Sequence, residues 1–108
     1  MVELSKKTKK ELRKLLTTAY ARELDQHILE LSMKFEDWKN RKIDCWDLND
    51  NIHKFHDGIS RKLFDAYNAR GVDDLYMISR AFASNLLLKE EIPTEAIEIV
   101  EHFANTLF

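Results

Sequence analysis

The chain has 108 residues, of which 44% are hydrophobic and 33% charged, and its formal net charge is −2. This length and balance fit one globular domain over residues 1–108, and they argue against a disordered chain or a strongly basic nucleic-acid-binding protein. Two glycines and one proline leave few points where a helix must stop, so we expect an all-α fold.

The sequence also indicates a compartment. A single cysteine, Cys45, excludes an internal disulfide and is typical of a reducing environment. No apolar run reaches the roughly 20 residues that a membrane span needs. The lysine-rich start lacks a following apolar segment, so we expect no signal peptide, no membrane association and a cytoplasmic location.

The first predicted element is an amphipathic helix of about 31 residues, roughly 47 Å long, that ends before residues 40–44. Ser5 or Thr8 is its expected N-cap, and Glu11 would complete a capping box with Thr8. Apolar residues that recur at intervals of three or four define its buried stripe. They are Leu12, Leu16, Tyr20, Leu24, Ile28, Leu31, Phe35 and Trp38.

The second predicted helix begins at Asp44 or Asp47, both good N-caps, and ends at Gly71, a typical C-terminal cap. Gly58 lies inside it at a cost of roughly 1 kcal/mol against alanine, and would permit either a close neighbour or a local kink. The apolar stripe consists of Leu48, Ile52, Phe55, Ile59, Leu63 and Ala66 or Tyr67.

Two shorter helices are predicted in the last third of the chain. One covers about Asp73 to Lys89, and the other starts with Pro93 at its first position. The fold class is therefore all-α, with a long antiparallel helical hairpin plus two shorter helices in a four-helix, bundle-like arrangement. The shorter pair cannot cover the whole hairpin, so we expect a homodimer, with a bent monomer as the alternative.

The candidate site is a polar cluster that the hairpin would bring together. Counting residues outward from a turn near residue 43 places His56 opposite Glu30, and His27 opposite Ile59. Three interpretations remain open: histidines that are hydrogen-bonded inside the hairpin, a contact with a ligand or partner, or a zinc or iron site at His53 and His56, whose spacing is only weakly specific. We predict neither a bound metal nor a cofactor. The candidate residues are His27, Glu30, His53, His56, Asp57 and Arg61.

A second interpretation concerns Arg22 and His27. Arginine followed by histidine after four intervening residues resembles the R-x4-6-H motif of HEPN ribonucleases, which are small, helical, dimeric and metal-independent. The resemblance implies that histidine moves the proton of a ribose 2′-hydroxyl while arginine stabilises the phosphate charge. We keep this metal-independent ribonuclease as an alternative function.

Segments 22–24, 35–38 and 52–64 together resemble a family of small bacterial all-helical proteins that has no established activity. The resemblance covers about residues 12 to 70 and implies a bacterial cytoplasmic setting. It makes four residues the first to test, namely His53, His56, Gly58 and Arg61.

The charges are unevenly distributed along the chain. The segment 6–14 is basic and the segment 89–101 is acidic, so we expect either two solvated faces or pairing of the two segments across a dimer. No aromatic residue interrupts the lysines, which argues against nucleic acid as a partner. We therefore expect a small interaction or accessory protein without enzymatic activity, with a protein partner possible besides its own second copy.

Overall fold

The computed structural model describes residues 3–69 and 73–108, and these fall into two compact units. We call residues 22–68 the hairpin unit, and the described residues of 1–21 and 69–108 the terminal unit. The first helix, α1 (Lys6–Lys39), runs from the terminal unit into the hairpin unit. The described residues contain helices and no strand, which confirms the all-α prediction. The expectation of a single domain stays a prediction.

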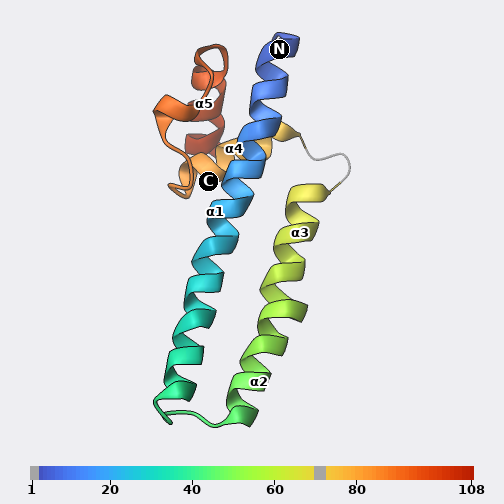
Figure 1. Cartoon of the computed structure of the whole chain (residues 1–108). Helices are drawn as coiled ribbons and strands as arrows, with labels where there is room; N and C mark the ends of the chain where they lie inside the picture. The colour runs from blue at the N-terminus through green and yellow to red at the C-terminus, as the bar shows by residue number, and fades with distance from the viewer. Residues whose placement is uncertain (1–2, 70–72) are drawn as a thin grey trace. The chain divides into compact units, whose positions relative to one another are not determined.

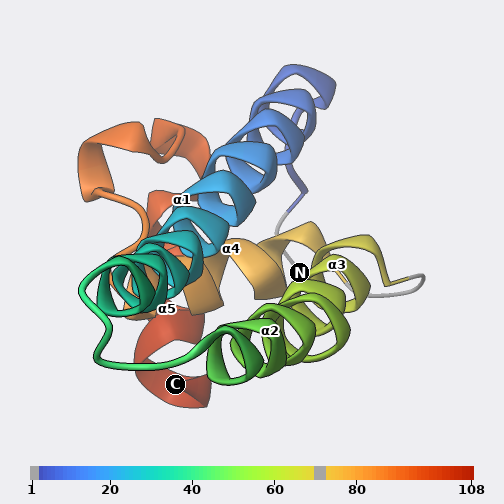
Figure 2. The same cartoon turned by 60° about the horizontal axis from the view of Figure 1, so that its bottom comes forward.

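The hairpin unit consists of the second half of α1 and a helical return segment. The return segment comprises α2 (Cys45–Lys54), a π-helical turn (Phe55–Ser60) and α3 (Arg61–Asn68). Figures 1 and 2 both show the two arms side by side and antiparallel. This arrangement confirms the predicted long hairpin, while the predicted end of the second helix at Gly71 lies outside the described residues.

Specific caps fix both sides of the hairpin turn. At the end of α1, Arg41 adopts a left-handed conformation with φ of 57°, and the Lys42 amide donates to the Asp37 carbonyl over 2.8 Å. These features form a Schellman motif. At the start of α2, the Asp47 amide donates to the Asp44 carboxylate over 2.8 Å, and the Asp44 amide donates to the Asp47 carboxylate over 3.3 Å. Asp44 is therefore the N-cap, as predicted.

The π-helical turn has a clear cause in the sequence. Phe55, Ile59, Leu63 and Tyr67 follow one another at three successive intervals of four residues. On an ideal α-helix, which turns about 100° per residue, each such interval rotates the stripe by about 40°, and three intervals by about 120°. A π-helical turn contains more residues per turn and so cancels much of this drift. It keeps the stripe directed at α1, with Leu63 buried.

The third helix is shorter than predicted. Helix α4 (Asp74–Ala83) follows its N-cap, Asp73, close to the predicted start, but ends well before Lys89. Asn85 has φ of 62° and the Leu86 amide donates to the Ala81 carbonyl over 2.9 Å, which is again a Schellman motif. Leu86 and Leu87 follow in a non-helical segment and are both buried, so the chain gains more from leaving the helix than from continuing it.

The fourth helix begins later than predicted. Pro93 does not start it; the residue precedes a short 3-10 turn (Thr94–Ala96), and α5 (Ile97–Leu107) follows. Helices α4 and α5 pack on each other within the terminal unit (Figure 1). The buried apolar residues of this unit are Leu4, Leu12, Ala19, Met77, Ile78, Ala81, Leu86, Leu87, Ile92, Ala96, Val100 and Ala104.

A carboxylate from the far end of the sequence caps the start of α1. Ser5 is the N-cap, since its hydroxyl accepts from the Thr8 amide over 3.1 Å. The predicted box between Thr8 and Glu11 does not form. Instead, Glu95 accepts from the Ser5 amide over 2.8 Å and from the Thr8 hydroxyl over 2.6 Å. Glu95 thus takes the part that a glutamate three residues after the N-cap plays in a capping box.

Candidate functional site

One side of the hairpin unit carries a charged groove of about 310 Å³. His27 and Ile59 both line it, as the antiparallel count predicted, and His27 Nδ1 lies 3.6 Å from the Glu30 carboxylate. Charged side chains of both signs, from Glu30, Lys34 and Lys54, border the groove, while Leu31, Phe55 and Ile59 make much of its exposed lining apolar. Its lining residues are His27, Glu30, Leu31, Lys34, Asn51, Lys54, Phe55 and Ile59.

The other predicted site residues do not join this groove. His53, His56, Asp57 and Arg61 are exposed, and none of them lines it. His56 was expected opposite Glu30 but does not line the groove with it, whereas the preceding residue, Phe55, does. The stripe of the return segment passes through Phe55, and the next residue points about 100° away. The structure therefore brings His27 and Glu30 together and leaves the second pair of histidines in solvent.

Among the described residues, the structure does not bring together the side chains that either enzymatic alternative would use. Arg22 and His27 are five residues apart on α1, so they project about 140° apart, and Arg22 is not among the groove residues. Among the described residues, no group of three or more His, Cys, Asp or Glu side chains is placed to hold a metal ion. The ribonuclease and metal interpretations stay predictions.

The opposite side of the hairpin unit has a different character, and we call it the apolar face. On α1 it comprises Leu24, Ile28, Ser32 and Phe35, and on the return segment Asn49, Ile52, His56, Ser60 and Phe64. Helical phase places most of these on the side away from the groove residues, with Leu24 near the line along which the two arms meet. The nine residues include no Lys, Arg, Asp or Glu, but Asp25 and Lys39 lie within about 20° of Ser32 on α1 and border the face.

The large side chains of the apolar face are open to solvent. Ile28 is 45% exposed, Phe35 and Ile52 are each 37% exposed, and Phe64 is 57% exposed. Sequence reasoning assigned the first three to the interior of the hairpin and did not include Phe64. The sequence does contain a signal for this face. Residues on one side of the predicted apolar stripe are charged, and those on the other side are mostly uncharged.

The hairpin turn forms a second hollow, of about 760 Å³. Beside it, Trp46 is 74% exposed, and Cys45 is also exposed. Three basic residues (Lys39, Arg41 and Lys42) and two acidic ones (Asp44 and Asp47) line the hollow, so it carries charge of both signs. It is lined by Trp38, Lys39, Arg41, Lys42, Ile43, Asp44, Cys45 and Asp47.

In the terminal unit, the basic and acidic segments meet within one chain. A groove of about 710 Å³ has Lys7 and Lys14 on one side and Glu90, Glu91 and Glu95 on the other. The pKa of Glu95 lies below its ordinary value because its carboxylate accepts hydrogen bonds from the Thr8 hydroxyl and from the Ser5 amide and hydroxyl. Hydrogen bonds from Ser5 and Thr8 to Glu95 thus join the start of α1 to the acidic segment within one chain.

Comparison with protein-family models, with curated proteins and with solved structures finds no match for this chain. The resemblances to HEPN ribonucleases and to the small bacterial helical proteins therefore stay predictions. Within the described residues, no helix is both long enough and apolar enough to cross a membrane.

Proposed function

We propose that this chain is a non-enzymatic interaction protein that binds amphipathic helices of a protein partner through the apolar face of its hairpin unit. A cytoplasmic location is part of the proposal and rests on the single cysteine. The proposal rests on one observation: the face is uncharged and has four large, solvent-exposed apolar side chains on two adjacent helices.

The composition of the face supports binding to protein. The buried cores of protein interfaces are depleted in charged residues and enriched in aromatic ones. Phe64 and Phe35 supply the aromatic anchors, and their neighbours on the face are aliphatic or small and polar. A charged ligand or nucleic acid would find no complementary group there, so the expected partner is an apolar helical surface.

Photo-crosslinking tests this function. A photoreactive phenylalanine analogue is placed either at Phe64, on the apolar face, or at Leu29, which is 61% exposed on the adjoining flank of α1. We expect irradiation of expressing cells to give discrete protein adducts from position 64, competed away by the unmodified chain, and few from position 29. Equal labelling at both positions, or none at position 64, contradicts the proposal.

A further inference from the structure

We infer that the partner on the apolar face is a second copy of this chain, so that two hairpin units close into a four-helix bundle. This inference rests on the proposed function, because it assigns the occupant of the same face. It would also bury the four large side chains that the hairpin unit leaves in solvent.

The side of the hairpin unit that carries the apolar face has the area that a stable dimer needs. The return segment from Cys45 to Asn68 is about 36 Å long, and two helices side by side are about 20 Å wide. This whole side, with the apolar face at its centre, thus covers roughly 700 Å², close to the value of about 800 Å² per partner that is typical of stable protein interfaces. It is therefore large enough to support self-association.

The width of the apolar face favours a partner that packs two helices on it over a partner that packs one. Ser32 and Phe64 lie about 80° to 100° from the line along which the two arms touch, so the uncharged surface extends past the groove between the arms. A single helix placed in that groove would leave Phe64, at the outer edge, in water. A layer of two helices covers both edges, and the hairpin unit of a second copy is such a layer.

The face also suits packing on itself. Each arm places a serine between large side chains: Ser32 lies between Ile28 and Phe35 on α1, and Ser60 lies between His56 and Phe64 on the return segment. A small residue between large ones leaves room for a side chain of the facing surface. Since the face has no Lys, Arg, Asp or Glu, a two-fold axis brings no like charges of these residues together within it.

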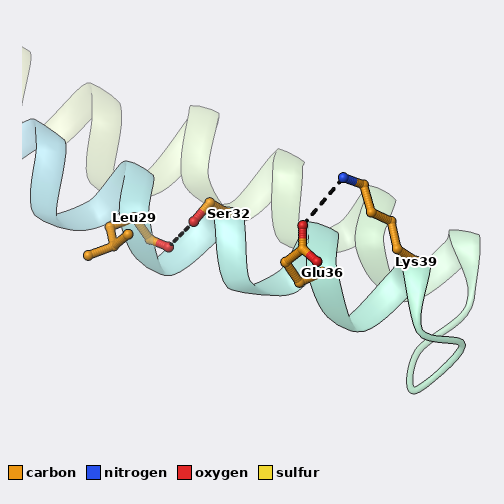
Figure 3. A network of polar contacts seen from close by, with 4 residues as sticks. All are labelled: Leu29, Ser32, Glu36 and Lys39. Atoms are coloured by element: carbon orange, nitrogen blue, oxygen red, sulfur yellow. Dashed lines mark hydrogen bonds and ion pairs between the residues drawn. The ribbon is translucent and has the colours of Figure 1, made fainter.

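Two neighbouring residues provide a matched test. Ile28 and Leu29 are isomers, and Ile28→Glu and Leu29→Glu make the same change of mass and charge at adjacent positions on α1. Ile28 belongs to the apolar face, whereas Leu29 lies about 100° further round the helix. Figure 3 shows Leu29 with Ser32 and Glu36 on α1, where the Ser32 hydroxyl donates to the Leu29 carbonyl over 2.6 Å.

The measurement is the mass of the full chain by light scattering across a concentration series, with helical content followed by circular dichroism. We expect the wild-type chain and Leu29→Glu to reach twice the chain mass of 12.8 kDa. Ile28→Glu should weaken self-association by at least about a hundredfold, because each interface would bury two unpaired carboxylates. Phe64→Glu, at the more exposed edge of the face, should act in the same direction with the helical content unchanged.

Two results would overturn the inference: a monomeric wild-type chain at every concentration, or equal dissociation of Ile28→Glu and Leu29→Glu. The crosslinking experiment separates this failure from failure of the proposed function. Adducts of another mass at position 64, from a chain that is monomeric alone, would retain the interaction protein and reject the second copy. Absence of adducts and of dimers would reject both.

Discussion

The terminal unit and the hairpin unit use the same kind of amphipathic helix but bury their apolar side chains to very different extents. Among the described residues, twelve buried apolar side chains belong to the terminal unit and two, Leu48 and Leu63, to the hairpin unit. Eight of the exposed large apolar residues lie in the hairpin unit and four in the terminal unit. The hairpin unit is thus the part that has apolar surface left for a partner.

The difference follows from how many elements surround each stripe. In the terminal unit the start of α1, helices α4 and α5 and the buried segment around Leu86 and Leu87 supply several apolar surfaces. Within the hairpin unit, the surface that packs on each arm comes from the other arm. Two helices in contact bury one narrow line of side chains, and residues 40° or more from that line stay partly in solvent.

The largest expected effect is on the free energy of unfolding, and it is tested by replacing two isoleucines, one in each unit, with alanine. Ile78→Ala removes a fully buried side chain from the terminal unit and should lower the free energy of unfolding by about 2–5 kcal/mol. Ile52→Ala removes a side chain that is 37% exposed in the hairpin unit, so a smaller loss of about 1 kcal/mol is expected at low protein concentration. Denaturant melts of both variants provide the comparison.

Repeating the melts at several protein concentrations makes this prediction more specific. If a second copy covers Ile52, the loss caused by Ile52→Ala should grow as the concentration of the chain rises, because the dimer then contributes to stability. The loss at Ile78 should stay constant. Equal losses at the two positions at low concentration would show that the two units do not differ in burial as described.

The second prediction concerns the cap that holds the terminal unit together. Hydrogen bonds from Thr8 and Ser5 lower the pKa of Glu95 in the folded chain. The ionised carboxylate therefore stabilises the fold at pH values above its ordinary pKa, near 4.5, and this contribution is lost as the pH falls through the lower folded pKa. Glu95→Gln should reduce stability at neutral pH and flatten its fall below pH 4.5.

The control for this cap is Glu90→Gln, which changes the same charge in the same acidic segment away from the N-cap of α1. We expect thermal melts at neutral pH to show a clear loss for Glu95→Gln and little change for Glu90→Gln. The same loss in both variants would mean that the general charge of the segment matters, not the hydrogen bonds to Ser5 and Thr8.

Local signals in the sequence were enough to predict the helices, but not where each helix ends. The steps of three and four residues predicted α1 and the return segment, and Asp44 was one of the two N-caps predicted for the second helix. The end of α4 at Ala83 depends on burial of Leu86 and Leu87 against residues distant in sequence, which no local pattern encodes. The role of Glu95 is equally non-local, since 90 residues separate it from Ser5.

The candidate site was predicted in part for a related reason. Antiparallel counting placed His27 near Ile59 correctly, because that count depends only on the position of the turn. It failed for His56, because stripe residues step by three or four, and a residue one position beyond the stripe points elsewhere. The apolar face was missed because the large residues at its edges were counted as core, although two arms alone cannot bury them.

The smallest expected effect is at Gly58, in the π-helical turn of the hairpin unit. A Cβ at this position would meet no atom within 4 Å, so alanine fits without displacing a neighbour. Gly58→Ala should therefore raise the free energy of unfolding by about 0.4–1 kcal/mol, mainly because the unfolded chain becomes less flexible. Denaturant melts at low concentration measure this. A loss of stability there would mean that the π-helical turn itself requires glycine, whereas a loss confined to high concentration would place Gly58 in the contact with the second copy.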